Sequence, residues 1–282
     1  MCAVAYCAQS VPQSLLPPTT RMKIFPQSCV LLLSSFFIMF NSPAQTIDNN
    51  AVINRDLLPV PSFSLDFAAD ALKKAGARYP DGQGFSFIQG RNGRPAVQFY
   101  GIDQPSVIQI PNTPSLQFSV AATVDMWVKI TANYGMNGEG NKVQRSGWLM
   151  SLLAKSHDRN GFVLLVMRQD PDESANKQAN FVSYDQTWNG IACEELERVP
   201  SIPVGEWYRV TAVASSKTGT HIYINKKLAV NCLNARPNFK TGNSQDLYIG
   251  RFKDSWYPVH GAIQDLRIYQ SALSEQQILA LP

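Results

Sequence analysis

The sequence predicts an all-β fold, an antiparallel sandwich or barrel. Three observations predict it: short runs rich in β-branched and aromatic residues recur between residues 63 and 269, turn-forming residues separate these runs, and helical periodicity is nearly absent. Short strands without helices between them are typical of sandwiches and barrels rather than of α/β folds. Neither a repeat nor a linker interrupts the series, so we expect residues 61–282 to form one domain.

Individual strands are expected where apolar and polar residues alternate, because successive side chains on a strand point to opposite faces. In the run 206–215, Val210 and Ala212 share one face, whereas Arg209 and Thr211 share the other. The expected strands are residues 63–67, 85–89, 96–99, 107–110, 123–130, 148–154, 162–168, 179–184, 207–215, 220–225, 228–232, 247–252 and 262–269.

The C-terminus is the exception to the absence of helical signals. Residues 274–277 (Ser-Glu-Gln-Gln) have the form of a capping box, in which Ser274 and Gln277 satisfy each other's backbone N–H groups. The apolar residues Ile278 and Leu279 follow directly. A short C-terminal helix is therefore expected after the last strand.

Residues 1–44 are expected to be a leader that contains a signal peptide. A basic region begins at Lys23, the apolar run Val30–Phe40 follows, and small residues precede a cleavage site after Ala44. The apolar run is shorter than the about 20 residues that a spanning helix needs. This pattern predicts export, either secretion or release into a bacterial periplasm; an uncleaved membrane anchor is the alternative.

Two segments flank this signal. Residues 1–21 lie upstream of the basic region and are interpreted as an over-extended start, with Met22 as the initiator. Residues 45–60 are largely polar and are expected to form a flexible N-terminal segment before the domain.

The net charge limits the classes of partner, and the cysteine content agrees with export. The net charge is +4 at pH 7, and Arg21 and Lys23 of the leader carry two of the positive charges. A balance this close to neutral predicts neither nucleic acid nor an anionic membrane surface as a partner. Cys193 and Cys232 are the cysteines outside the leader. In an exported chain they predict one disulfide, with two buried free thiols as the alternative.

Five segments in succession resemble one family. They resemble characteristic blocks of laminin G-like jelly rolls, which belong to the concanavalin A-like lectin/glucanase superfamily. The resemblance implies a two-sheet antiparallel jelly-roll sandwich with a short C-terminal helix. The segments are residues 96–118 (AVQFYGIDQPSVIQIPNTPSLQF), 124–130 (VDMWVKI), 152–166 (LLAKSHDRNGFVLLV), 205–230 (GEWYRVTAVASSKTGTHIYINKKLAV) and 248–281 (YIGRFKDSWYPVHGAIQDLRIYQSALSEQQILAL).

Two positions depart from the family pattern. The hairpin that is usually Asn-Gly is Asn225-Lys226 here, and Lys at a turn position with positive φ costs ~1 kcal/mol relative to Gly, which favours another turn type.

The first acidic residue of the final strand is replaced by Gln264. Related domains hold a structural calcium near this strand, so the resemblance implies Asp66 and Gln264 as calcium ligands. Because the amide removes one charged ligand, a site without metal is the alternative.

The sequence offers no convincing catalytic constellation. It lacks the E-x-D-x-x-E spacing that places carboxylates in one glycosidase cleft, and it lacks a G-x-S-x-G elbow or a P-loop. Trp127, Trp148 and Trp207 lie in apolar strand patterns and are expected in the core. The loop residues that combine aromatic with hydrogen-bonding groups, and so form candidate ligand contacts, are Tyr134, Asn137, His157, Asp158, Arg159, Trp188, Asn189, Trp256 and Tyr257.

Of these candidates, Trp256 and Tyr257 are neighbours on the chain and cannot both face the core from one strand. Either the pair forms a ligand platform, or its side chains pack beneath a loop. We expect the two rings to differ, with one buried against the sheet and the other, that of Trp256, at the loop rim.

The resemblance implies a secreted, non-catalytic domain that binds carbohydrate or glycan. A protein-interaction or envelope-structural domain is the alternative, with a cell-surface protein as the partner, and a polysaccharide-acting enzyme is a third possibility. No nucleic-acid partner and no stable membrane span in the mature chain are expected.

Overall fold

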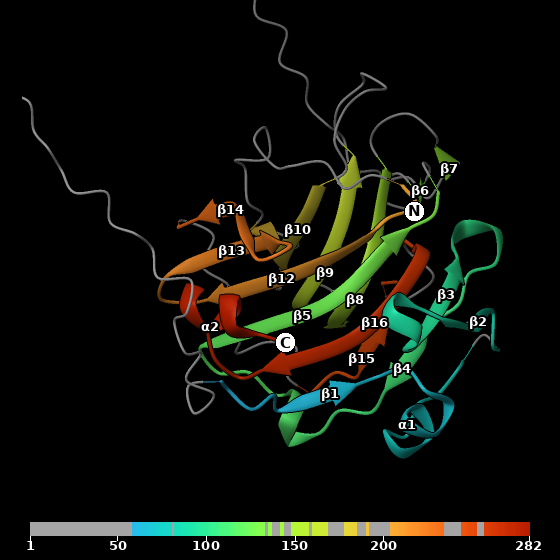
Figure 1. Ribbon diagram of the computed structural model, residues 1–282, viewed down its shortest axis with the longest axis horizontal. Coiled ribbons are helices and arrows are strands. Elements are labelled where there is room, and N and C mark those ends of the chain that lie inside the picture. Colours follow the sequence, from blue (N-terminus) through green and yellow to red (C-terminus); the bar gives the residue numbers. More distant parts are fainter. Residues whose placement is uncertain are drawn as a thin grey trace, which may run out of the picture. The chain divides into compact units, whose positions relative to one another are not determined.

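The computed structural model of the protein describes residues 58–80, 82–132, 135–136, 142–143, 148–157, 160–168, 178–184, 190–191, 204–233, 244–252 and 257–282 (Figure 1). These ranges belong to one compact unit, residues 52–282. Among the described residues, no helix is both long and apolar enough to cross a membrane.

Within the described ranges, sheet A contains eight antiparallel strands. Its order is β14-β13-β12-β5-β16-β3-β2, and β1 also pairs with β16. The strands are β1 (Phe63–Leu65), β2 (Phe85–Gln89), β3 (Pro95–Tyr100), β5 (Ala121–Ile130), β12 (Trp207–Ser215), β13 (Gly219–Ile224), β14 (Lys227–Cys232) and β16 (His260–Tyr269).

Sheet B also contains eight antiparallel strands among the residues that the structure describes. Its order is β11-β10-β9-β8-β15-β4, and the short strands β6 and β7 extend it beside β8. The strands are β4 (Ile108–Ile110), β6 (Gly135–Met136), β7 (Lys142–Val143), β8 (Trp148–His157), β9 (Asn160–Arg168), β10 (Gln178–Tyr184), β11 (Gly190–Ile191) and β15 (Leu247–Ile249).

The two sheets face each other across one apolar core. From sheet A, Val124, Met126 and Val128 of β5 point into it, and from sheet B, Ile108 and Ile249 meet them. Burial of this apolar surface is the main favourable term in folding. The architecture is therefore the predicted two-sheet antiparallel jelly-roll sandwich, and the predicted alternation of β12 is confirmed.

The predicted C-terminal helix is confirmed, and a second helix was not predicted. In α2 (Glu275–Ala280), Ser274 and Gln277 form the expected capping box. Helix α1 (Ala69–Lys74) follows β1 and fully buries only Leu72, so it is too short to show a periodic apolar pattern. Three-residue 3₁₀ turns complete the described helical elements: η2 (Arg91–Gly93), η3 (Gly101–Asp103) and η4 (Pro114–Leu116).

Two tryptophans that were expected in the core lie on the outer face of sheet A. Trp127 and Trp207 are half-buried, because the alternation of their strands gives the inward positions to Met126, Val128 and Val210 instead. Arg91 stacks over the Trp127 ring, with its guanidinium carbon 3.9 Å from the ring centroid. The side chain of Trp148 lies outside the described residues.

The hairpin between β13 and β14 keeps the turn type that the sequence disfavoured. Asn225 and Lys226 have φ values of 50° and 67°, as a type I′ turn requires. Asn225 Oδ1 accepts the backbone N–H of Arg209 at 3.0 Å. Lys226 Nζ donates to the backbone carbonyl of Leu279 at 2.9 Å and also to that of Leu281. The lysine therefore caps the last carbonyls of α2, which a glycine could not do.

Candidate functional site

A pocket opens along one edge of β16, because two different strands, β3 and β1, pair with that edge. Strand β3 pairs with residues 260–263 and β1 pairs with residues 266–268, while β5 occupies the whole opposite edge. Between these pairings β16 bulges, and Asp265 takes a left-handed backbone with φ 56°. The chain leaves β1 at Asp66 and turns into α1, which closes the pocket from the far side.

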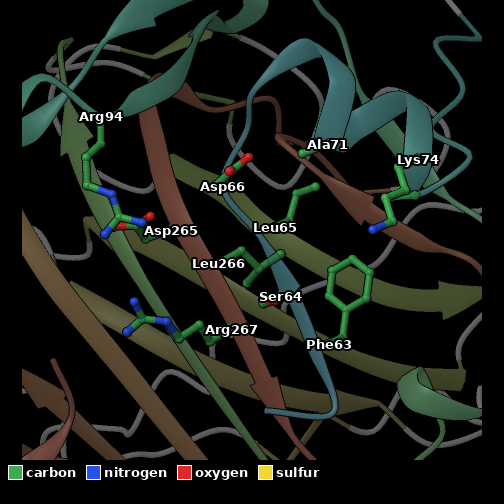
Figure 2. Close-up of a pocket in the computed structure, with 11 residues that line it drawn as sticks. Phe63, Ser64, Leu65, Asp66, Ala71, Lys74, Arg94, Asp265, Leu266 and Arg267 are labelled. Carbon is green, nitrogen blue, oxygen red and sulfur yellow. The ribbon is translucent and has the colours of Figure 1, made fainter. Parts of the chain in front are cut away.

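The pocket has a volume of about 510 Å³ and combines apolar with charged walls. Figure 2 shows Arg94, Asp265 and Arg267 on one side of β16, and Phe63, Leu65 and Lys74 toward α1 on the other. The lining residues are Phe63, Ser64, Leu65, Asp66, Ala71, Lys74, Ala75, Arg94, Asp265, Leu266 and Arg267.

The Asp265 carboxylate is bound by two neighbouring side chains. Arg94 Nη1 lies 2.8 Å from Asp265 Oδ2, and Gln264 Nε2 donates to the same oxygen at 3.2 Å. The Asp265 side chain is 6% exposed, whereas that of Arg94 is 50% exposed. The carboxylate is therefore covered, and the guanidinium presents its remaining N–H groups to the pocket and to solvent.

Gln264 fixes the loop that carries Arg94. Its Oε1 accepts the backbone N–H of Arg91 at 2.7 Å, and its Nε2 faces the carbonyl of Arg91 at 3.4 Å. A Cβ at Gly90 would collide with Gln264 Oε1, so the close approach requires glycine there. Together with the Arg91–Trp127 stacking, these contacts position Arg94 beside the bulge.

Arg267 belongs to a buried ionic network on the outer face of sheet A. Asp125 accepts two hydrogen bonds from the guanidinium of Arg209, at 2.8 and 2.7 Å, and one from Thr211 Oγ1 at 2.7 Å. Arg267 Nη1 is 3.8 Å from Asp125 Oδ2, a distance beyond a hydrogen bond. Asp125 is therefore mainly satisfied by Arg209 and Thr211, and Arg267 keeps donor capacity at the pocket.

The remaining polar groups of the pocket are lightly engaged. Asp66 Oδ1 accepts the N–H of Ala68 at 3.0 Å and so begins the turn into α1. Lys74 is exposed in the last turn of α1 and has no ion-pair partner within the part of the chain that the structure describes. Phe63 is half-buried and packs partly against the core, so its ring forms an apolar wall. The pocket can therefore contact an apolar ligand face and hydrogen-bond its substituents.

The oxygen ligands available near β16 do not fit a calcium ion. Calcium takes six to eight oxygen ligands, several of them charged. Asp66 lines the pocket, but the amide oxygen of Gln264 is already accepting from Arg91, and Asp265 is paired with Arg94. Among the described residues, no group of three or more His, Cys, Asp or Glu side chains could hold a metal. The cation beside the bulge is instead a guanidinium.

Lys155 is a buried cation of sheet B that does not line the pocket. Lys155 of β8 is 1% exposed, and its ammonium donates to Asn112 Oδ1 at 2.8 Å and to the carbonyl of Gln245. Burial lowers the pKa of Lys155 to about 8, and the nearby Asp246 carboxylate opposes this shift. Its donors are directed at protein oxygens, which indicates a structural role.

Most of the candidate ligand residues from the sequence cannot be placed. His157 ends β8, but its side chain is not among those described. Tyr257 is half-buried with φ 53°, its carbonyl accepts the N–H of Ser151 at 2.6 Å, and burial raises the pKa of its hydroxyl. The residues that lie outside the described ranges are Tyr134, Asn137, Asp158, Arg159, Trp188, Asn189 and Trp256.

The predicted disulfide also falls partly outside the described residues. Cys232 ends β14 and is 7% exposed, whereas Cys193 is not described. The pairing of Cys193 with Cys232 stays a prediction.

Of the pocket residues, sequence reasoning singled out only Asp66. The implied calcium ligands pointed to this part of the chain, and the structure pairs β1, which directly precedes Asp66, with β16. Phe63, Lys74 and Arg94 carried no recognisable motif. These residues lie close together because β1 and β3 pair with the same edge of β16. The local sequence does not reveal with which edge a strand pairs.

Comparisons with known proteins agree with the observed sandwich fold. The family model of the concanavalin A-like lectin/glucanases superfamily matches residues 103–279, more than half of the sequence. A search of curated proteins gave no significant match.

Two solved structures with low sequence identity, both with a TM-score above 0.5, have the same fold. The binding domain of Paraclostridial mosquitocidal protein 1 is 15% identical with a TM-score of 0.56, and the comparison covers 78% of this chain and 51% of that one. The binding domain of botulinum neurotoxin serotype G is 13% identical with a TM-score of 0.55, covering 78% and 50%. The chain thus spans about half the length of these two toxin domains. Domain 4 of AbnA, a GH43 extracellular arabinanase from Geobacillus stearothermophilus in complex with arabinotriose, is 22% identical with a TM-score of 0.49, covering 72% and 85%.

Proposed function

The chain belongs to the concanavalin A-like lectin/glucanase superfamily, and on this basis we propose that it is a non-catalytic domain that binds carbohydrate. We propose further that it acts outside the cytoplasm, as a secreted or periplasmic protein. The signal-peptide pattern of residues 1–44 supports export. Because one fold hosts many functions, the site has to carry the rest of the proposal.

The observation that carries the proposal is the pocket beside β16. Sugar rings present an apolar face and a rim of hydroxyl groups, and a binding site needs an apolar surface with a few placed polar groups. Phe63 supplies a flat ring, and Ser64, Asp66, Lys74 and Arg94 supply donors and acceptors around it. A volume of about 510 Å³ is sufficient for one or two sugar units, since ligand pockets are commonly about 300–1,000 Å³.

The state of the two pocket carboxylates favours binding over hydrolysis. Glycosidases need one carboxyl group that can donate a proton and a second that acts as nucleophile or base. Asp265 is covered and accepts from both Arg94 and Gln264. Only Asp66 is exposed among the carboxylates that line the pocket, so this pocket lacks a second accessible acid.

A protein partner is the second candidate, and the edge of sheet A supports it. Among the described strands, β14 ends the order of this sheet, and Leu228 and the following Leu233 are 47% and 57% exposed. An edge strand with exposed apolar side chains can pair with an extended segment of another protein. This surface lies on strands other than those that line the pocket, so separate substitutions can test the two candidates.

Glycan binding by the full chain tests the proposal. We expect the wild-type protein to bind a subset of glycans on an array, and Phe63→Leu to weaken that binding about two- to twelvefold, because the specific geometry of an aromatic contact contributes about 0.5–1.5 kcal/mol. Leucine preserves most of the packing of Phe63 against the core. Phe87→Leu is the matched control, since Phe87 is 42% exposed but does not line the pocket.

Two outcomes would contradict the proposal. If the folded wild-type protein binds no glycan, carbohydrate is not its ligand and the protein candidate takes precedence. If Phe63→Leu and Phe87→Leu bind as the wild type does, the pocket beside β16 is not the sugar site.

A further inference from the structure

We infer that the pocket between β1, α1 and β16 selects an acidic sugar, one that carries a carboxylate or a sulfate group, over its neutral counterpart. This inference rests on the proposed function, because it names the class of glycan that the same pocket takes. Two features support it: the charges in the pocket that a ligand can reach, and the positions of the cationic side chains.

The accessible charge of the pocket is positive. Three cationic side chains line it, Lys74, Arg94 and Arg267, against two carboxylates. One of these carboxylates, Asp265, is 6% exposed and is covered by Arg94, so a ligand cannot reach it without breaking an ion pair. Asp66 is the carboxylate that remains exposed. An anionic ligand therefore meets three cationic groups and one accessible acid.

The cations keep donors that the protein does not use. Arg94 contacts Asp265 through Nη1, which leaves part of its planar fork for a second acceptor. Arg267 is 3.8 Å from a carboxylate that Arg209 and Thr211 already satisfy. Lys74 has no ion-pair partner among the described residues. Guanidinium groups match the oxygens of carboxylate and sulfate, and such charge-assisted hydrogen bonds are about twice as strong as neutral ones.

The arrangement also places the charged and apolar walls on different sides. Figure 2 shows the two guanidinium groups across β16 from the Phe63 ring, with Lys74 above the ring on α1. A sugar ring that stacks on Phe63 lies on the same side of β16 as Lys74, so its acidic substituent would face Lys74, with the two guanidinium groups on the other side of the strand. A neutral sugar would offer these cations no charged acceptor, which lowers its relative affinity.

The test compares two polymers with the same sugar ring. Binding of the full chain to polygalacturonate and to fully methyl-esterified polygalacturonate is measured by titration calorimetry, with dextran sulfate as the sulfated probe. We expect the carboxylated or the sulfated polymer to bind at least about tenfold more tightly than the neutral ester, and this preference to shrink as salt is raised.

Two lysines on one helix give the matched variants. Lys74→Gln removes a pocket cation at an exposed position, and Lys73→Gln removes its exposed neighbour, which does not line the pocket. Lys74→Gln is expected to weaken acidic-polymer binding about three- to tenfold, and Lys73→Gln to leave it within about twofold. Neither lysine side chain has a partner among the described residues, so both variants should fold.

Each result separates the inference from the function on which it rests. Tighter binding of polygalacturonate identifies a carboxylated sugar, and tighter binding of dextran sulfate alone identifies a sulfated one; both support the inference. If neither polygalacturonate nor dextran sulfate binds more tightly than the neutral ester, the inference is overturned while glycan binding stands. Equal losses in Lys74→Gln and Lys73→Gln would mean diffuse surface attraction and would also overturn it. If no glycan binds at all, the proposed function itself fails.

Discussion

At the scale of single residues, Gln264 shows how an amide can serve where a carboxylate was expected. Its oxygen accepts from the N–H of Arg91, and its nitrogen faces the carbonyl of Arg91 and donates to Asp265. A carboxylate could accept but could not donate, and it would stand beside a second negative charge. The residue that departs from the family pattern is therefore the one that anchors the loop carrying Arg94.

Gln264→Glu should lower the free energy of unfolding by about 1–3 kcal/mol at pH 7, because it removes a donor and leaves an ionised group in a buried place. Asp265 should raise the pKa of the introduced carboxyl in the folded state. A raised folded pKa means that stability falls as pH rises above the unfolded value of about 4.3, so the loss should shrink near pH 4. Urea unfolding at pH 4 and pH 7 measures this.

Gln117→Glu is the control, since Gln117 is exposed and its side chain makes no hydrogen bond among the described residues. A loss in Gln264→Glu that is no larger than in this control at both pH values would show that the amide does not anchor the loop.

At the scale of elements, the C-terminal helix is held by residues of the sheet on which it lies. Ile278 and Leu281 pack with Val213, Tyr223 and Tyr269 in a small apolar cluster separate from the main core. Lys226 and Arg209 donate to the last carbonyls of this segment. A lysine in a type I′ turn thus offsets its conformational cost by ordering a distant helix.

Two substitutions at this turn separate its opposing effects. Lys226→Met should lower the free energy of unfolding by about 1–2 kcal/mol, because it removes the ammonium donor and keeps the strained backbone. Lys226→Gly removes the same donor but relieves about 1 kcal/mol of strain, so its stability should lie between those of Lys226→Met and the wild type. Urea unfolding gives the order. A glycine variant more stable than the wild type would show that the contacts to α2 contribute little.

Local patterns predicted the elements better than they predicted the surfaces between them. The alternation of β12 and the capping box of α2 were both correctly predicted, because each depends on residues a few positions apart. The placement of Trp127 in the core was wrong, since apolar character at a strand position does not say which face is outward. The contact of Gln264 with Arg91 spans 173 positions, and a single sequence does not reveal such partners.

At the scale of the whole molecule, the fold is expected to be stable without calcium. The guanidinium of Arg94 supplies the positive charge next to the bulge of β16, and the described donors do not fit a metal ion. We expect the melting temperature to change by less than about 1 °C between excess EDTA and millimolar calcium, because a ligand stabilises only a state that it binds. A calcium-dependent rise of several degrees in thermal melting would contradict this.

The pairing of β1 with β16 joins the two ends of the described domain. Ser62 Oγ donates to the carbonyl of Ile268, a contact between residues 206 positions apart. During synthesis the walls of the pocket are therefore far apart until the last strand is available, and contacts of such long range form slowly. A ligand that bridges these walls would oppose opening of the whole domain rather than of one loop. Its binding free energy would add to the global stability and slow the separation of the first strand from the last.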